Sequence, residues 1–196
     1  MKRDFQGGGG FTVSGRADLP SGLVTFMFTD IEGSTRLARM LGDGYGAILD
    51  DHRTVLRAAL RDFGGLDLFT EGDSFFVVFR DAASALMASV EAQRRLSAYR
   101  WPSPDVRPLV RMGMHTGWAR PVGGGYASHE VHRAARVAAA AHGGQILCSG
   151  ATALAVGAMP SMRASKVGNV PITSSSSGSV EPLPRVANTA RRFGCA

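Results

Sequence analysis

The sequence predicts an α+β fold in which helices pack on one face of a mixed β-sheet. Short apolar runs rich in β-branched and aromatic residues alternate with long segments of helical periodicity, which predicts strands joined by crossover helices. In the middle of the chain, pairs of short runs are separated only by turn residues, which indicates hairpins. The resulting order is β–α–β–β–α–β, followed by a strand, a helix and a strand.

Glycines and polar turns separate the predicted elements. Gly64-Gly65 ends the first long helical segment, because glycine readily adopts the left-handed conformation that closes a helix. Thr70-Glu71-Gly72-Asp73 and Gly123-Gly124-Gly125 are predicted hairpin turns. The predicted strands cover residues 23–28, 66–69, 75–79, 106–116 and 146–149, with a second hairpin over 117–126. The predicted helices cover 36–63, with a break near 42–44, and then 82–99, 131–141 and 151–158.

Changes in composition divide the chain into three parts. Residues 1–22 contain four consecutive glycines, and we expect them to be a flexible leader. Residues 23–160 hold all the predicted elements and form one domain. Residues 161–196 contain four consecutive serines and lose the apolar periodicity, so we expect them to be disordered.

The overall composition is that of a folded domain with a basic surface. Hydrophobic residues make up 44% of the 196 residues and charged residues 19%, which is enough apolar material for a core. The net charge of +6 suits an anionic ligand such as a triphosphate, and it suits a nucleic acid equally well. All basic residues except Lys2 and Lys166 are arginines spread along the chain without a run, which argues against a polybasic stripe for nucleic acid or membrane.

The sequence pattern shows no targeting signal and no cysteine framework. No stretch approaches the ~20 apolar residues of a membrane helix, and residues 1–22 lack the apolar block of a secretory signal. Cys148 and Cys195 form neither a disulfide framework nor a zinc motif. We therefore expect a soluble cytoplasmic protein.

Two aspartates, Asp30 and Asp73, each stand at the end of a predicted strand beside a tight turn. If the two strands are neighbours in the sheet, the carboxylates converge on one edge and form a hard-oxygen site for Mg²⁺ or Mn²⁺. A pair of metals there could activate a hydroxyl and stabilise a leaving phosphate. Aspartate is also common in turns for purely conformational reasons, so the spacing alone leaves both interpretations open.

Four parts of the chain carry motifs in a fixed order. They are VTFMFTDIEGST at 24–35, TEGDSFFVVF at 70–79, RMGMHTG at 111–117, and VHRAARV at 131–137 followed by AHGGQILCS at 141–149. Together they resemble the signature motifs of the class III adenylate and guanylate cyclases, over about residues 22–158. The resemblance implies a ferredoxin-like βαββαβ core, with helices packed on a mixed, mostly antiparallel sheet.

The resemblance also implies a homodimeric enzyme that converts ATP or GTP to a 3′,5′-cyclic nucleotide and pyrophosphate. Asp30 and Asp73 would bind two Mg²⁺ or Mn²⁺ ions, with the backbone carbonyl of Ile31 as a further ligand. Arg136 would stabilise the charge that develops on the α-phosphate, and it would come from the second subunit, so that a site exists only in the dimer. Outside this motif, Arg136 would be interpreted as a solvated helical arginine.

The same resemblance assigns the contacts to the substrate. The loop from Phe28 to Gly33 would wrap the phosphates, partly through backbone N–H groups near a helix start. The predicted substrate-binding residues are Phe28, Thr29, Glu32, Gly33, Ser34, Thr35, Phe69 and Gly72.

Three positions depart from the family pattern. The helix of Arg136 usually carries an Asn four residues earlier, and here His132 stands there, either as a catalytic residue that bonds the ribose or as a plain interfacial residue. Phe69 and the Gly123–Gly125 turn occupy the positions that select the base. Neither offers a side-chain hydrogen bond to a purine edge, so we predict loose base specificity, with Phe69 able to stack on a base.

The tail departs further from the family. The family ends in a strand pair with a lysine that binds the triphosphate, and residues 161–196 show nothing similar, since Lys166 is their only lysine. We hypothesise that the tail is an out-of-frame or degenerate replacement, which leaves a sheet edge exposed. Translation of the gene in the other two frames would test this hypothesis.

Two functions remain open from the sequence. The two aspartates and Arg136 favour an active cyclase, whereas His132, Phe69 and the tail favour a degenerate cyclase-homology domain that dimerises or binds nucleotide as a regulatory module. An RNA-binding domain of ferredoxin-like fold would need exposed aromatic residues on its sheet, but the adjacent phenylalanines at 75–76 must point to opposite faces.

Overall fold

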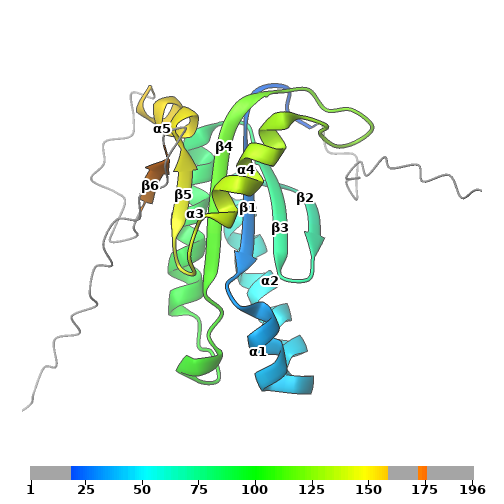
Figure 1. The fold of residues 1–196 in the computed structure, drawn as a ribbon, viewed down its shortest axis with the longest axis vertical. Helices are drawn as coiled ribbons and strands as arrows, with labels where there is room; N and C mark the ends of the chain where they lie inside the picture. The colour runs from blue at the N-terminus through cyan, green and yellow to red at the C-terminus, as the bar shows by residue number, and fades with distance from the viewer. Residues whose placement is uncertain (1–18, 159–171, 176–196) are drawn as a thin grey trace, which may run out of the picture.

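The structure, a computed structural model, describes residues 19–158 and 172–175, which form a six-stranded mixed sheet covered by helices (Figure 1). This is the predicted α+β class with the predicted βαββαβ core. The strands are β1 (Gly22–Ile31), β2 (Leu66–Glu71), β3 (Ser74–Phe79), β4 (Val110–Ala119), β5 (Ile146–Ser149) and β6 (Ile172–Ser175). The helices are α1 (Ser34–Leu41), α2 (Tyr45–Asp62), α3 (Ala82–Ala98), α4 (His129–Ala139) and α5 (Gly150–Gly157), with 3₁₀ turns at Gly42–Gly44 and Pro104–Val106.

The order of the strands places the ends of β1 and of the β2–β3 hairpin side by side. The sheet order is β2-β3-β1-β4-β5-β6. β1 runs antiparallel to both β3 and β4, whereas β4, β5 and β6 are parallel to one another. Because Thr29 is the register partner of Phe75, the residues just after Thr29 lie next to the turn that precedes Phe75.

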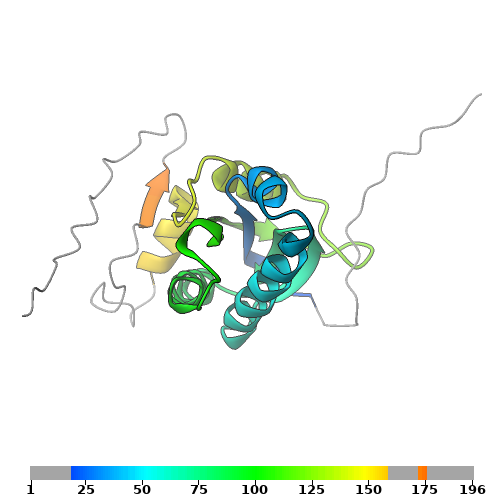
Figure 2. The ribbon, with the colours of Figure 1, turned by 90° about the horizontal axis from the view of Figure 1, so that it is seen from below.

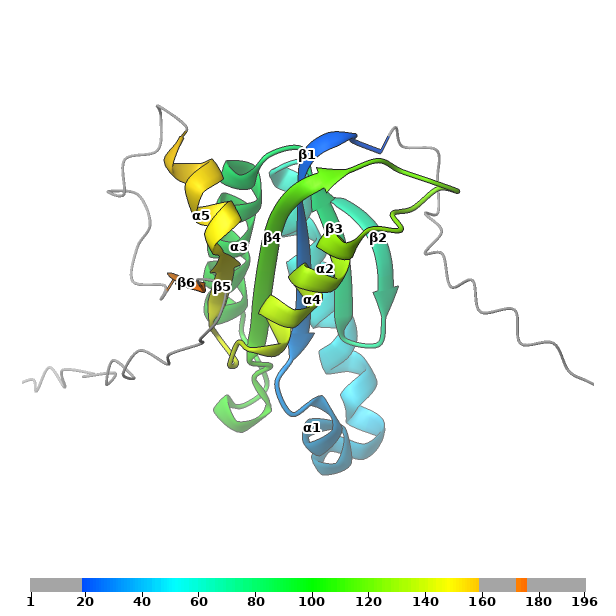
Figure 3. The ribbon, with the colours of Figure 1, turned by 45° about the horizontal axis from the view of Figure 1, so that its top comes forward.

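Helices pack on both faces of the sheet. Met27 and Ile31 of β1 pack in the larger core cluster with residues of α2 and α3. Val24 and Phe26 point the other way and pack with Val131 of α4. Figures 2 and 3 show α2 and α3 on one side of the strands and α4 on the other. The predicted placement of all helices on one face is therefore wrong, because the continuous apolar run of β1 supplies two buried faces.

Two glycines allow α4 to contact the backbone of β4. A Cβ atom at Gly113 would lie 2.1 Å from the backbone nitrogen of Ala138, and one at Gly117 would lie 2.6 Å from Cγ of Glu130. Residues 113 and 117 project from the same face of the strand, since side chains alternate with period two. The position of α4 over the sheet therefore depends on the absence of side chains at both residues.

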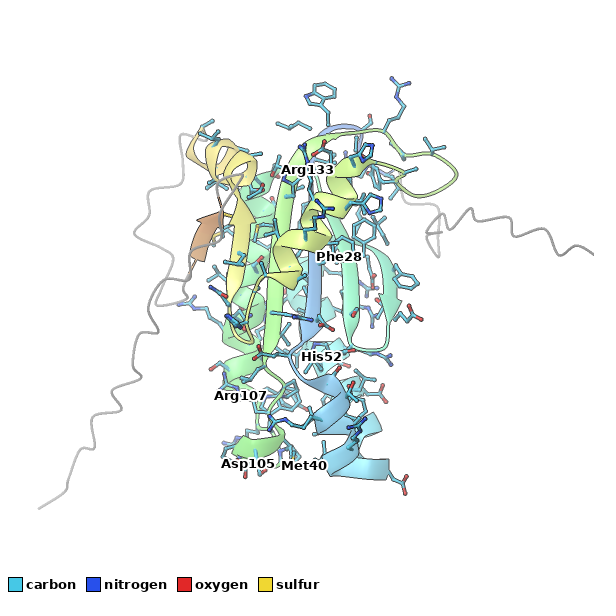
Figure 4. All side chains as sticks on the ribbon, in the orientation of Figure 1. Phe28, Met40, His52, Asp105, Arg107 and Arg133 are labelled. Carbon is cyan, nitrogen blue, oxygen red and sulfur yellow. The ribbon has the colours of Figure 1, made fainter. Side chains whose placement is uncertain are left out.

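His52 is fully buried in α2, on the side that faces the sheet. Its ring meets Phe75 edge to face, with 6.1 Å between the ring centroids, and neither ring nitrogen has a hydrogen-bond partner in the part of the chain that the structure describes. Burial lowers the pKa of His52 to about 4, and the positive charge of Arg53 acts in the same direction. Figure 4 marks His52 beside β1. The imidazole is therefore neutral at physiological pH.

Stability is expected to fall as the pH drops from 6.5 towards 4, with His52 as one cause. Because the folded-state pKa lies below the unfolded value, the unfolded chain takes up the proton first, and up to roughly 3 kcal/mol of stability is lost through this range. His52→Leu should reduce the slope of the unfolding free energy against pH between these values, measured by urea denaturation. His129→Gln, at an exposed site on α4, should leave the slope unchanged. A wild-type slope in His52→Leu would contradict the assignment.

Two predicted boundaries around β4 differ from the structure. The strand begins at Val110 rather than at 106, because residues 104–106 form a 3₁₀ turn and Pro108 has no N–H to donate to a ladder. The predicted hairpin over 117–126 has no return strand, since only Val122 and Gly125 form an isolated bridge across the glycine turn. Tyr126 instead enters the smaller core cluster, where its hydroxyl donates to the carbonyl of Pro20.

The strand β6 lies within the segment predicted to be disordered. Ile172–Ser175 pairs in parallel with Ile146–Ser149 of β5, so the prediction of disorder is wrong for these four residues, and β5 is not an exposed edge. The remainder of the predicted leader and tail, at 1–18, 159–171 and 176–196, lies outside the described residues. Within the described ranges, no helix has both the length and the apolar character that crossing a membrane requires.

Candidate active site

The turn between β2 and β3 brings Asp73 next to Asp30, near the end of β1. The backbone N–H of Ile31 donates to Oδ2 of Asp73 at 3.1 Å. The hydroxyl of Ser74 donates to Oδ1 of Asp30 at 3.2 Å. Each carboxylate is thus bonded to the chain neighbour of the other, and the structure brings together the two aspartates that the sequence singled out.

The electrostatics of this pair favour a bound cation. Burial raises the pKa of Asp73, and the negative charge of Asp30 raises it further, while the backbone N–H groups of Asp73 and Ile31 lower it. A raised carboxyl pKa means that the ionised form is disfavoured where it stands. A positive ion between the two carboxylates would remove that penalty.

The donor set fits a magnesium or manganese ion. The described residues contain no cluster of three or more His, Cys, Asp or Glu side chains that could hold a metal. Asp30 and Asp73 would therefore share an ion with backbone oxygens, such as the carbonyl of Ile31, and with oxygens of a substrate. Mg²⁺ is usually held in this way, by one or two carboxylates together with substrate phosphates.

Arginines of α2 fix the hairpin that carries Asp73. The Nε and Nη2 atoms of Arg53 both donate to the carbonyl of Gly72, at 3.0 and 2.8 Å. Gly72 has φ of +56°, a left-handed conformation that suits glycine in this tight turn. One turn along α2, Arg57 pairs with Asp67 at 3.2 Å and lies over the ring of Phe75 at 5.1 Å. Neither arginine lies in one of the four sequence motifs, so neither could be singled out from the sequence.

Arg111 pairs with Asp30 from the neighbouring strand. The two residues are register partners between β4 and β1, and both the Nε and Nη2 atoms of Arg111 donate to Oδ2 of Asp30. Arg111 opens one of the sequence motifs, but the sequence analysis assigned it no function. Finding it from sequence would have required knowing that β4 lies antiparallel to β1 in this register.

The loop after β1 leads directly into the first helix. Gly33 has φ of +70° and precedes Ser34 and Thr35, the first residues of α1, and no side chain caps this helix start. The backbone N–H of Arg36 donates to the carbonyl of Gly33 at 2.9 Å, so within the described residues the N–H groups of Ser34 and Thr35 are the ones available to an anion at this helix start. Glu32 is exposed and turns towards His142, with 3.5 Å between Oε1 and Nδ1. The structure thus brings Gly33, Ser34 and Thr35 together, and orients the Glu32 side chain elsewhere.

Phenylalanines cover the sheet face beside Asp30. Phe28 stacks on Phe76 with 4.4 Å between centroids and 7° between planes, and Phe69 of β2 is the register partner of Phe76. Phe28 and Phe69 are both half-buried, so part of each ring is accessible to a ligand. Thr29 differs, because its side chain is buried on the opposite face. Any contact of Thr29 with a phosphate would have to come from its backbone.

His132 and Arg136 both point away from the sheet. They are exposed residues one turn apart on α4, whose buried positions are Val131, Ala134 and Ala138. Within the described residues, the guanidinium of Arg136 makes no hydrogen bond or ion pair. Figure 4 marks their neighbour Arg133 on α4, in front of the sheet. The structure therefore does not join His132 or Arg136 to the aspartate pair of the same chain.

A buried polar network anchors the start of α4. The Nε2 atom of His115 lies 2.5 Å from Oε2 of Glu130 at the start of α4, and its Nδ1 atom lies 2.7 Å from the hydroxyl of Ser149. Ser149 caps α5 by accepting from the backbone N–H of Thr152, and hydroxyl contacts continue to Thr116. This network ties α4 to three other elements, and the sequence analysis did not anticipate it.

Comparison with known proteins decides the family. The sequence profile of the adenylate and guanylate cyclase catalytic domain matches residues 18–181. The chain belongs to the class III adenylate and guanylate cyclase family. The match runs past residue 160 and includes β6, so it extends beyond the limit at which the motif resemblance ends.

Relatives of the cyclase domain occur in fungi and bacteria. An adenylate cyclase of Mycosarcoma maydis is 36% identical over 156 residues, which is 66% of this chain and 6% of the relative. An adenylate cyclase of Podospora anserina is 33% identical over 156 residues, or 66% of this chain and 7% of the relative. An uncharacterised protein of Mycobacterium tuberculosis is 31% identical over 145 residues, or 72% of this chain and 48% of the relative. The matched region is thus less than half of each of these relatives.

Solved structures of cyclase domains share the fold. An adenylate cyclase from Trypanosoma brucei, described in its monomeric state, superposes with a TM-score of 0.64 at 24% identity, covering 71% of this chain and 78% of that one. The adenylyl cyclase CyaB from P. aeruginosa superposes with a TM-score of 0.58 at 22% identity, covering 70% and 82%. At these identities, the similarity establishes the architecture of the cyclase domain and not its substrate.

Proposed function

We propose that this cyclase domain converts ATP or GTP to a 3′,5′-cyclic nucleotide and pyrophosphate, as a homodimer with two divalent ions in each site. The domain would act in the cytoplasm, where nucleoside triphosphates are abundant. One observation carries the proposal. The carboxylates of Asp30 and Asp73 lie together at one strand edge, while Arg136 is exposed on α4 and has no ion-pair partner among the described residues. A second copy of the chain can bring these two halves together.

Each residue near the pair has a distinct task in this proposal. Asp30, Asp73 and the Ile31 carbonyl would hold the ions, which when bound supply Lewis-acid activation of the ribose 3′-hydroxyl and neutralise the leaving pyrophosphate. The free N–H groups that follow Gly33 would bind phosphate oxygens. Arg136 of the second subunit would donate to the α-phosphate, where a permanently charged planar group stabilises the developing charge.

His132 would orient the ribose from the same helix. It stands one turn before Arg136 and is exposed on the same face, so both side chains would reach the same site across a dimer interface. A neutral imidazole can donate one hydrogen bond and accept another, which suits a ribose oxygen.

Base recognition would rest on stacking. Phe28 precedes Asp30 by two residues on β1, and Phe69 is the register partner of Phe76, on which Phe28 stacks. Both rings are half-buried, and a phenyl ring can stack on either purine but cannot distinguish their hydrogen-bonding edges. Gly72 would contribute through the turn that places Asp73. We therefore expect the domain to accept both ATP and GTP.

The regulatory alternative, a degenerate domain with little or no activity, is less favoured. The matched profile is that of a catalytic domain, and several relatives are named adenylate cyclases. Asp30, Asp73 and Arg136, the side chains to which the proposal gives the metal ions and the α-phosphate, are also all present.

A cyclase assay with the purified chain tests the proposal. Wild-type protein with Mn²⁺ should form cyclic nucleotide from both ATP and GTP, and Asp30→Asn should lower the rate at least about 100-fold, since even outer-shell changes at metal sites cost 10–100-fold. Asp43→Asn, at an exposed aspartate in the turn before α2, is the matched control and should retain activity. An inactive wild-type protein would support the regulatory alternative, and an active Asp30→Asn variant would remove Asp30 from the site.

A further inference from the structure

Asp30 is already paired with a cationic side chain, that of Arg111. The side chains of Arg111 and Asp30 are 31% and 28% exposed, so the pair is partly shielded from solvent. Both donors of the guanidinium converge on a single oxygen, Oδ2, while Oδ1 accepts from Ser74. Neither oxygen of Asp30 is therefore free of a hydrogen bond.

Asp73 has no such partner. Its carboxylate accepts from the backbone N–H of Ile31, and within the described residues it forms no ion pair. The two aspartates are thus unequal, since Asp30 is paired with an arginine and Asp73 has no cationic partner among the described residues. Arg53 of α2 donates to the carbonyl of Gly72 and to Asp50.

We propose that Arg111 competes with the metal for Asp30: its guanidinium occupies Oδ2 and must leave before a divalent ion can bind that oxygen. This inference rests on the proposed function, because it takes Asp30 to be a metal ligand. Arg111 would lower the affinity of the site for a metal ion, whereas Asp30 and Asp73 would bind the ion.

The chemistry of the pair makes the competition unavoidable. Oδ2 can accept two strong charge-assisted hydrogen bonds or coordinate a metal ion, but it cannot do both in the same geometry. A divalent ion is attracted by both carboxylates, whereas Arg111 pairs only with Asp30. An ion can therefore displace Arg111 from Asp30, but its binding free energy is reduced by the cost of breaking that ion pair.

Binding of Mn²⁺ without nucleotide measures this cost. Isothermal titration of Mn²⁺ into wild-type protein, Arg111→Met and Arg111→Lys should give affinity about tenfold higher for Arg111→Met, since a partly exposed charged pair of this kind is worth about that factor. Arg111→Lys should fall between the two, because it keeps the charge but loses the two-donor geometry. Arg94→Met removes the same charge from an exposed site on α3 and should leave the affinity unchanged.

Melting temperatures provide a second readout that does not need activity. Without metal, Arg111→Met should melt below wild type, since Asp30 and Asp73 then repel each other without a counter-charge. Saturating Mn²⁺ should raise its melting temperature more than that of wild type. If Arg111→Met does not fold, Arg111→Lys carries the same comparison.

The outcomes separate this inference from the proposed function. Equal Mn²⁺ affinity in wild type, Arg111→Met and Arg111→Lys, together with loss of binding in Asp30→Asn, would overturn the competition and leave the metal site intact. Weaker binding in Arg111→Met would overturn it as well, and would make Arg111 a support of the site. Absence of Mn²⁺ binding in every variant would overturn both the inference and the proposed metal site.

Discussion

A mixture of Asp73→Asn and Arg136→Met chains is expected to regain the cyclase activity that each variant lacks alone. Arg136→Met should lower the rate by about 10²–10³-fold, as expected for removing a donor to developing charge. In a mixed dimer, one site receives both defects and the other receives intact residues from both chains. With random pairing, activity should return to about a quarter of the wild-type value, since half of the dimers contain one good site.

The structure supplies the reason to expect complementation and a matched control. Arg136 is exposed on the outer face of α4 and is not joined to the aspartates of its own chain. Arg133 is a neighbouring exposed arginine, 3.4 Å from Glu130, and Arg133→Met alone should stay active. No recovery at concentrations where both variants are dimeric by light scattering would show that Arg136 does not act across subunits.

Gly113→Ala is expected to cause a large loss of stability, larger than a methyl group added at any other glycine that the structure describes. The added Cβ would lie 2.1 Å from the backbone nitrogen of Ala138 and 2.2 Å from its Cα, so no side-chain rotation can relieve the clash. The loss should reach or exceed the upper end of the ~1–3 kcal/mol range that is usual for overpacking. Thermal unfolding followed by circular dichroism should show a fall of about 10 °C, at roughly 2–4 °C per kcal/mol for a chain of this size.

Gly46→Ala is the matched control for this prediction. Gly46 lies in α2 with open space around its Cα and an ordinary helical backbone, so alanine there should stabilise the helix by up to ~1 kcal/mol. The two substitutions add the same methyl group and should shift the melting temperature in opposite directions. If Gly113→Ala has the same melting temperature as the wild type, α4 does not contact the backbone of β4 as closely as described.

Local pattern was sufficient for most elements but not for their arrangement around the sheet. Gly42 and Gly64 marked the ends of helices because each has a positive φ, a backbone conformation that other residues avoid. The return strand after β4 was predicted from a glycine turn, but Tyr126 packs into the smaller core cluster instead of pairing back. Such a choice depends on tertiary contacts and not on the turn residues. The strand β6 has a serine-rich sequence, and its pairing with β5 outweighs that local preference.

In the candidate site, too, some residues could be predicted from local sequence and others depend on tertiary contacts. Asp30 and Asp73 could be singled out because each stands beside a turn within a recognisable motif. Arg111 could not, since its role arises from a register 81 residues away in sequence. His115 was equally hidden, because its partners Glu130 and Ser149 come from two different elements and meet only in the folded chain.

The two hydrogen bonds from Arg53 to the Gly72 carbonyl link the position of α2 to that of the turn between β2 and β3. A helix that slides along its axis would carry this carbonyl with it, and Asp73 is the next residue in the chain. The distance between the carboxylates of Asp30 and Asp73 therefore depends on the position of α2, which lies on the opposite face of the sheet. A displacement of α2 would change the geometry of the aspartate pair.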